Sequence, residues 1–163
     1  MKSTSLETSL LPPMDSNNFG LLKVEDLAVS IAGTKIIDSI SFSLKRGEIL
    51  GVVGANGSGK TTLIRSIAGL LKPDLGTISV EGVGASDLGH SERARIISYM
   101  PQQVESHPFT AFEAVLMGRY PHLGRLELEG VADREIAFSA MRRTGTESFA
   151  DRRLDTLSGG ERQ

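Results

Sequence analysis

The first part of the chain carries apolar and polar residues in a pattern typical of two neighbouring strands. Residues 22–31 are rich in valine, leucine and isoleucine, a composition that favours a strand. Residues 36–44 alternate, with Ile40, Phe42 and Leu44 separated by serines, so apolar and polar side chains fall on opposite faces. Residues 32–35, Ala-Gly-Thr-Lys, predict a turn. The pattern predicts an antiparallel hairpin with one face in solvent.

The next apolar segment does not alternate. Residues 49–53 read Ile-Leu-Gly-Val-Val, which indicates a strand buried on both faces, as in an α/β sheet. After a glycine-rich loop, residues 60–71 repeat apolar side chains at helical spacing. Pro73 and Gly76 end that helix, and residues 76–80 predict another strand.

The second half of the chain is predicted to be mainly helical. Thr110 and Glu113 form a capping box, which begins a helix that runs to about Gly118. The other elements expected are a short helix at 91–95, a strand at 96–100, a loop at 120–130 and a helix at 133–143. Antiparallel strands, then a strand–loop–helix unit, then helices: this order predicts an α/β fold.

Composition narrows the possible functions. The chain has 163 residues, 39% of them hydrophobic, and a net charge of −2; this is ordinary for a globular domain and unlike a general nucleic-acid binder. The absence of cysteine excludes disulfides and thiolate metal sites. Residues 1–20 are polar and proline-containing, so we expect a disordered leader, and no apolar run approaches the roughly 18 residues of a membrane span.

The loop between the buried-type strand and the helix carries the strongest chemical signal. Residues 54–61 match G-x-x-x-x-G-K-[ST] at every fixed position, a pattern expected by chance in roughly one chain in a hundred or fewer. Lys60 would reach the β- and γ-phosphates of ATP, the Thr61 hydroxyl would ligate Mg²⁺, and the Thr62 hydroxyl would lie near the α-phosphate. The predicted nucleotide-binding residues are Gly54, Ala55, Asn56, Gly57, Ser58, Gly59, Lys60, Thr61 and Thr62.

A second motif lies at the end of the chain. Residues 157–163 read Leu-Ser-Gly-Gly-Glu-Arg-Gln. Ser158 and Glu161 form a capping box that predicts a helix start, and the glycine pair leaves backbone amides open to an anion. From these residues alone, a plain helix cap is favoured over an anion site.

These two motifs together resemble the ATP-binding cassette (ABC) ATPases. Residues 157–163 match the signature sequence of that family, about a hundred residues after the P-loop, and Gln102 stands where the family has its Q-loop glutamine. The resemblance implies a P-loop NTPase of the ABC type, with an antiparallel β subdomain, a RecA-like core and a helical subdomain at about 109–157. It covers residues 21–163, as a partial ABC domain.

The same resemblance implies a composite ATP site. Two cassettes would pair head to tail as a homodimer, so that Ser158, Gly159 and Gly160 of one contact the γ-phosphate in the P-loop of the other. Gln102 would contact Mg²⁺ or the attacking water. Lys60 and Gln102 are thus the expected catalytic residues, and Thr61 and Gln102 the expected Mg²⁺ ligands.

A finer resemblance concerns residues 115–122, Val-Leu-Met-Gly-Arg-Tyr-Pro-His. This segment is similar to the segment after the Q-loop in importers of iron–siderophore complexes, haem and cobalamin. From the residues alone, it is a helix C-terminus closed by Gly118 and a turn that contains proline. The resemblance implies integral membrane permease subunits, indirectly a periplasmic or surface substrate-binding protein, and a peripheral position on the cytoplasmic face of the inner membrane. No metal is assigned to His107 or His122.

The sequence departs from the family in two places. Ile31 stands where members usually stack an aromatic ring on adenine, so stacking weakens. The chain stops at Gln163, before the family's Walker B Asp, catalytic Glu and switch His, so we expect a fragment that hydrolyses ATP poorly. Two alternatives to an importer ATPase are a soluble cassette ATPase and a nucleotide-binding fragment without turnover.

Overall fold

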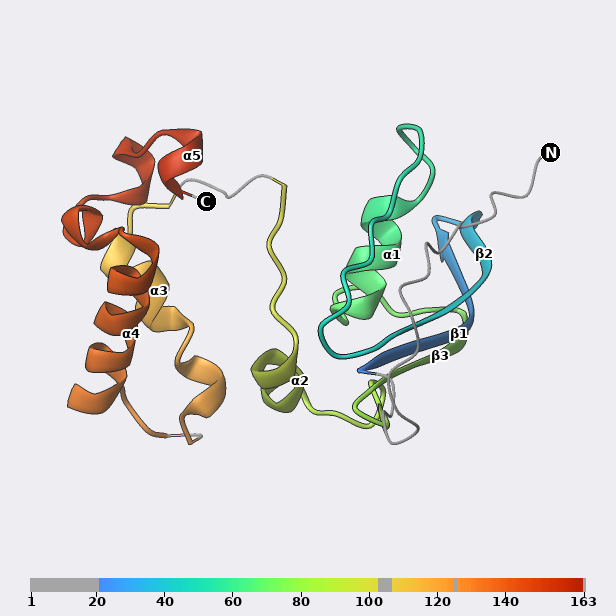
Figure 1. The fold of residues 1–163 in the computed structure, drawn as a ribbon, viewed down its shortest axis with the longest axis horizontal. Helices are drawn as coiled ribbons and strands as arrows, with labels where there is room; N and C mark the ends of the chain where they lie inside the picture. The colour runs from blue at the N-terminus through green and yellow to red at the C-terminus, as the bar shows by residue number, and fades with distance from the viewer. Residues whose placement is uncertain (1–20, 103–106, 125, 163) are drawn as a thin grey trace.

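The computed structural model describes residues 21–102, 107–124 and 126–162, so the expected leader at 1–20 lies outside the described residues. The elements form two groups (Figure 1). One contains the β-sheet and helix α1 (Lys60–Ile67), and the other contains α3 (Ala111–Met117), α4 (Val131–Thr144) and α5 (Gly159–Arg162). We call them the β lobe (residues 21–85) and the helical lobe (residues 107–124 and 126–162).

The sheet of the β lobe is antiparallel, with strand order β2-β1-β3-β4. Its strands are β1 (Leu22–Ile31), β2 (Thr34–Leu44), β3 (Leu75–Val80) and β4 (Val83–Gly84). The register of β1 and β2 runs from Leu22 opposite Leu44 to Ile31 opposite Thr34. The hairpin predicted from the alternating pattern is therefore confirmed.

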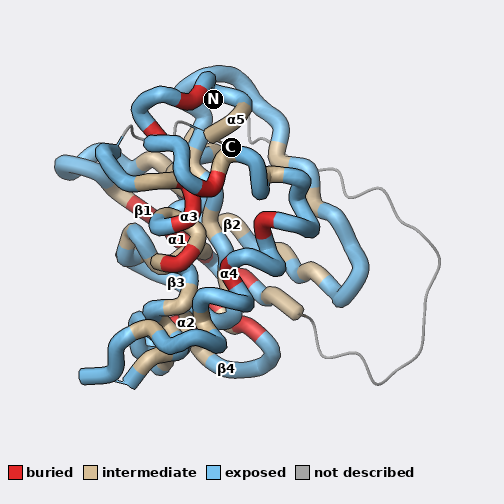
Figure 2. Tube along the Cα trace, turned by 90° about the vertical axis from the view of Figure 1, so that its left-hand side faces the viewer, coloured by how far each residue is buried: buried red, intermediate tan, exposed pale blue. Residues whose placement is uncertain are grey.

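Helix α1 packs on this sheet and completes the core of the β lobe. Leu27 and Val29 of β1 are fully buried, and Leu63 of α1 is 3% exposed (Figure 2). The buried cluster consists of Val24, Leu27, Val29, Ile37, Leu63, Ile78 and Ala85. This core supports the helix that follows the glycine-rich loop.

The sequence prediction was wrong about the length of α1. The predicted helix ran to residue 71, whereas α1 ends at Ile67. Gly69 adopts a φ of +72°, its N–H donates to the carbonyl of Ser66 (3.0 Å), and the N–H of Leu70 donates to that of Arg65 (2.9 Å). This pair of bonds is a Schellman motif, which ends a helix at a left-handed glycine.

Two predicted strands, at 49–53 and 96–100, are also absent among the described residues. Ile49 is 99% exposed and Val53 82% exposed, and neither segment pairs with a strand. A buried parallel strand needs hydrogen-bonding neighbours as well as cover on both faces. Among the described residues, these two segments have no strand beside them to hydrogen-bond with and no cover on both faces. Their apolar sequence therefore does not form the strands that it predicts.

The helical lobe has a separate core. Phe112 and Leu116 of α3 pack with Ala137 and Met141 of α4, and Leu157 closes the cluster. The predicted capping box is confirmed: the N–H of Glu113 donates to Thr110 Oγ1 (3.2 Å), and the N–H of Thr110 donates to Glu113 Oε2 (2.7 Å). Short 3₁₀ turns join the helices, at η1 (Tyr120–His122), η2 (Glu147–Phe149) and η3 (Leu154–Thr156).

Helix α2 (His90–Ile96) lies between the two groups in Figure 1. It confirms the short helix predicted at 91–95. None of its residues is buried, and none belongs to the core cluster of either lobe. Hydrogen bonds rather than apolar burial therefore fix its position.

An ion pair in the helical lobe makes its stability depend on pH. Arg119 Nε lies 2.9 Å from Asp133 Oδ1, and both side chains are largely buried. The hydrogen bond from Arg119, followed by that from the N–H of Gly130, holds the pKa of Asp133 below its ordinary value. The stabilisation is therefore complete above the pKa of the unfolded state and is lost as the pH falls through the lower folded pKa.

We expect the helical lobe to lose stability as the pH is lowered from 6 to 3. In urea unfolding followed by circular dichroism, Asp133→Asn should be less stable than the wild-type chain at pH 6, because Arg119 loses its charged partner. The variant should also show a shallower fall in stability toward pH 3. Equal pH slopes in the two proteins would show that Asp133 does not carry this dependence.

Candidate nucleotide-binding site

The P-loop coils at the N-terminus of α1 and leaves its amides available. Gly59 is the N-cap residue of α1, and no side chain caps the helix there. The N–H of Leu63 donates to the carbonyl of Gly59 (2.9 Å), whereas the N–H groups of the preceding first turn have no partner within the helix. Free amides and the positive end of the helix dipole together favour a bound anion.

Lys60 lies over this loop. Its Nζ donates to the carbonyls of Gly54 (2.7 Å) and Ala55 (2.8 Å), so the ammonium group is held at the mouth of the loop. Hydrogen bonds from a cation to phosphate oxygens are stronger than those to neutral carbonyls. A phosphate bound at the first turn of α1 can therefore replace these carbonyls as the hydrogen-bond partner of Lys60, because the new interaction is the more favourable one.

The loop fits closely against the hairpin. Gly59 adopts a φ of +92°, and a Cβ at this position would lie 3.2 Å from the carbonyl oxygen of Ile36 on β2. A side chain is disfavoured here both by the backbone conformation and by this neighbour. The β1–β2 turn, with Ile31 47% exposed beside it, consequently lies near the start of α1. Ile31 offers an apolar but non-aromatic surface.

The structure does not bring together the two residues expected to ligate Mg²⁺, Thr61 and Gln102. Thr61 lies in the first turn of α1 and its side chain is exposed, with no hydrogen bond among the described residues. An alcohol oxygen in that position suits a hard cation such as Mg²⁺. Gln102 is exposed and follows α2 on the segment that leads to the helical lobe. The structure gives no contact between Gln102 and the P-loop.

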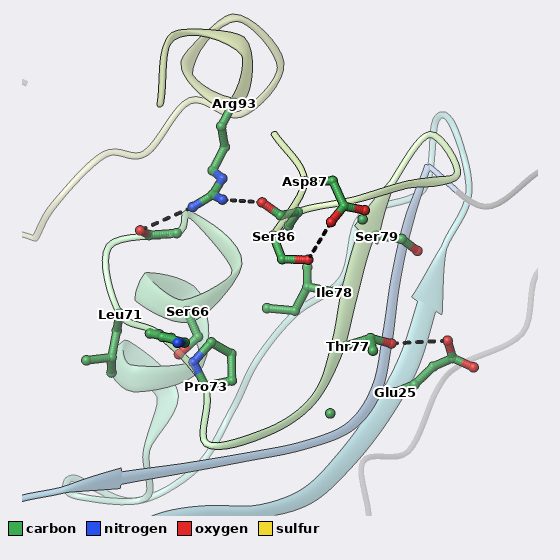
Figure 3. Close-up of a pocket in the computed structure, with 15 residues that line it drawn as sticks. Glu25, Ser66, Leu71, Pro73, Thr77, Ile78, Ser79, Ser86, Asp87 and Arg93 are labelled. Atoms are coloured by element: carbon green, nitrogen blue, oxygen red, sulfur yellow. Dashed lines mark hydrogen bonds between the residues drawn. The ribbon is translucent and has the colours of Figure 1, made fainter. Parts of the chain in front are cut away.

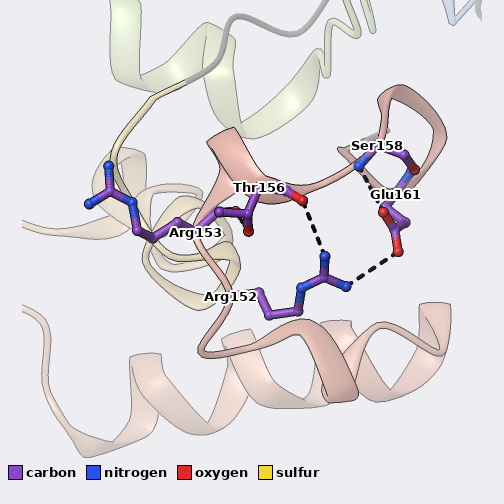
Figure 4. A network of polar contacts seen from close by, with 5 residues as sticks. All are labelled: Arg152, Arg153, Thr156, Ser158 and Glu161. Carbon is purple, nitrogen blue, oxygen red and sulfur yellow. Dashed lines mark hydrogen bonds and ion pairs between the residues drawn. The ribbon is translucent and has the colours of Figure 1, made fainter.

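The signature segment lies in the helical lobe and has the predicted cap. The N–H of Ser158 donates to Glu161 Oε2 (2.7 Å), and the N–H of Glu161 donates to Ser158 Oγ (3.4 Å) (Figure 4). The backbone hydrogen bond from Ser158 lowers the pKa of Glu161. Gly159 and Gly160 are exposed, and a Cβ on either would meet nothing within 4 Å. Their backbone is open to a partner.

One residue that the sequence did not single out supports this segment. Arg152 Nη1 lies 3.4 Å from Glu161 Oε1, and Arg152 Nη2 donates to the carbonyl of Thr156 (3.2 Å) (Figure 4). The two contacts connect the turn before the signature to its capping glutamate. No sequence pattern predicts this pair, because its members are nine residues apart across an irregular turn.

A cavity of about 700 Å³ lies away from this chemistry. It opens beside the C-terminal end of α1, between that helix and β3, and none of the P-loop residues 54–61 lines it (Figure 3). Residues 21–102, 107–124 and 126–162 contain no group of three or more potential metal ligands. Over the same ranges, no helix has the length and apolar character needed to span a bilayer.

Comparison with known proteins supports the family that the P-loop and the signature segment indicate. The family model described as ABC transporter matches residues 37–163. The cobalamin import ATP-binding protein BtuD of Halobacterium salinarum is 42% identical over 143 residues, which are 87% of this chain and 35% of that protein. The hemin import ATP-binding protein HmuV of Gloeobacter violaceus is 40% identical over 144 residues, 88% of this chain and 52% of its own length.

A solved structure supports the same fold. An ATP-binding cassette captured as a dimer in a post-hydrolysis state with ADP and phosphate superimposes with a TM-score of 0.71 at 25% identity. The match covers 86% of this chain and 65% of that cassette. The chain thus spans about half the length, or less, of the two curated relatives named above.

Proposed function

Because the chain belongs to the ABC transporter family, whose ATP-binding subunits hydrolyse ATP, we propose that it binds ATP with Mg²⁺ through residues 54–62. We propose further that it contributes to the ATPase of a chelate importer. The observation that carries the proposal is the P-loop itself, with Lys60 over the uncapped first turn of α1. The fold and the sequence of the relatives agree with this proposal.

The residues have distinct roles in this proposal. Backbone amides of the loop and of the first turn of α1, together with the Lys60 ammonium, would bind the β- and γ-phosphates, and the Thr61 hydroxyl would hold Mg²⁺. The bound ion would neutralise charge that develops on the phosphates during transfer. Gln102 orients the attacking water or the metal. In each case the protein positions groups and stabilises charge, which supplies most of the catalysis of phosphoryl transfer.

A second copy of the chain completes the site. Ser158, Gly159 and Gly160 are exposed on the helical lobe, where their hydroxyl and amides would meet a γ-phosphate held by the P-loop of the partner. The dimeric state of the related cassette supports such a pairing. A hydroxyl and two glycine amides at a helix start are suited to binding an anion.

We propose permease subunits in a membrane as the further partners, with the protein peripheral on the cytoplasmic side. The substrate class would be an iron–siderophore complex, haem or cobalamin. The two relatives named above, a cobalamin import and a hemin import ATP-binding protein, support this class, as does the segment at 115–122. The helical lobe would supply the surface that meets the permease.

Co-expression of the full-length protein with a permease of the chelate-importer class tests this function. The tagged protein should co-purify with the permease from detergent-solubilised membranes and should support uptake of the chelate into right-side-out vesicles that contain ATP. Lys60→Ala is the matched control: it should still co-purify, because the substitution lies far from the helical lobe, but it should abolish uptake. Recovery of the complete protein free of permease would instead favour a soluble cassette ATPase.

A further inference from the structure

Helix α2 carries two arginines that reach in different directions. Arg93 contacts the β lobe and Arg95 contacts the helical lobe. We propose that Arg93 and Arg95 are positioning residues for the ATPase reaction, which fix the orientation of the helical lobe, with Ser158–Gly160, relative to the P-loop helix α1. The reaction part of this inference rests on the proposed function.

Arg93 binds the end of the P-loop helix. Its guanidinium donates to the carbonyl of Gly69 (3.4 Å) and to that of Ala85, the two hydrogen bonds of Arg93 drawn in Figure 3. It also donates to the carbonyl of Leu88 (3.4 Å). Gly69 closes α1 with a φ of +72°, which favours glycine, and a Cβ there would lie 1.8 Å from Arg93 Nη1 and displace the guanidinium from its present place. A cation at this position also interacts favourably with the negative end of the dipole of α1. Arg93 thus attaches α2 to the helix whose other end forms the P-loop.

Arg95 binds the opposite lobe. Its Nε donates to the carbonyl of Pro121 in η1 (2.6 Å), and residues two apart on a helix point in nearly opposite directions. The turn that contains Pro121 is itself anchored, because Arg119 pairs with Asp133 of α4. Contacts therefore run from the C-terminus of α1 through α2 and η1 to α4.

This path matters because the described parts of the two lobes share no core. Among residues 21–102, 107–124 and 126–162, the buried cluster of the β lobe and that of the helical lobe have no residue in common, so a shared apolar core does not fix the relative orientation of these parts. The chain after α2 runs directly to Gln102. Loss of an arginine contact would consequently loosen the signature segment and Gln102 together, while the P-loop and its hairpin stay intact.

Distances between spin labels measure this orientation directly. The chain contains no cysteine, so Ser43→Cys on β2 and Ser139→Cys on α4, both at exposed positions, can be labelled specifically. Pulsed electron paramagnetic resonance without nucleotide should give a narrow distance distribution. Arg95→Ala and Arg93→Ala should widen it about twofold or more, and Arg95→Lys should restore part of the order. Arg143→Ala, an exposed arginine of α4 without a polar contact in the described part of the chain, should leave the width unchanged.

Kinetics of the complete protein supply the second readout. Arg95→Ala should reduce kcat for ATP about tenfold while KM changes less than about twofold, since a lost charged hydrogen bond of this kind has an effect of that order. An unchanged distance distribution in Arg95→Ala overturns the inference, as does an unchanged kcat or a raised KM. Failure of the wild-type chain to bind MgATP would refute the proposed function but not the distance result, which needs no nucleotide.

Discussion

Substitution of Lys60 by alanine is expected to weaken MgATP binding by about 100-fold. Lys60 places the only side-chain ammonium of the 54–61 loop at its mouth, within 2.7–2.8 Å of two loop carbonyls. A charged hydrogen bond to a phosphate is worth about 1.5–3 kcal/mol net of hydration, and a loss near the upper end of that range, about 2.7 kcal/mol, corresponds to 100-fold. Isothermal titration of the chain with MgATP measures the change.

A second variant, Lys72→Ala, distinguishes the loss of a phosphate contact from the loss of one positive charge. Lys72→Ala removes the same charge from an exposed position beyond the C-terminus of α1, at the end of the helix away from the P-loop. Its affinity for MgATP should stay within about twofold of that of the wild-type chain, because exposed charges at such distances are screened by salt. Equal losses in Lys60→Ala and Lys72→Ala would mean that Lys60 acts through general charge and does not contact the phosphates.

The sequence predicted best where the determining interactions are local. The alternation of 36–44 was sufficient for the hairpin, since period-2 patterning sets both the strand and its buried face. The capping boxes at Thr110 and Ser158 also formed as predicted, because each needs only residues three apart. The P-loop motif likewise fixed the place where α1 begins.

Prediction failed most clearly where distant residues decide the outcome. The segment 49–53 has the composition of a buried strand, yet strand formation depends on neighbours that lie elsewhere in the chain. The end of α1 at Ile67 is a different case, because it depends on the nearby Gly69, a local stop signal to which the prediction from the apolar stripe gave no weight. The arginine contacts of α2 and the Arg152–Glu161 pair join irregular segments, and no periodic pattern reports such contacts.

The separation of the two cores leads to the second large expected effect. Met141 is 1% exposed at the centre of the helical core, and Leu27 is fully buried in the β core. Truncation of either to alanine leaves a cavity and should cost about 2–5 kcal/mol of unfolding free energy. The location of the damage should differ: Met141→Ala should raise hydrogen exchange in α3 and α4, and Leu27→Ala should raise it in the sheet and α1.

We expect the affinity for MgATP to depend on the core of the β lobe and not on the core of the helical lobe. Leu27→Ala removes support from the sheet on which α1 packs, so MgATP affinity should fall with stability, whereas Met141→Ala should leave affinity within about twofold. Met141→Leu nearly conserves side-chain volume and should cost less than about 1.5 kcal/mol, which distinguishes a cavity from a general effect of substitution. Hydrogen exchange measured by mass spectrometry, peptide by peptide, decides the matter. If Met141→Ala accelerates exchange equally in both lobes, the lobes unfold as one cooperative unit, and their orientation cannot be set by the arginines of α2 alone.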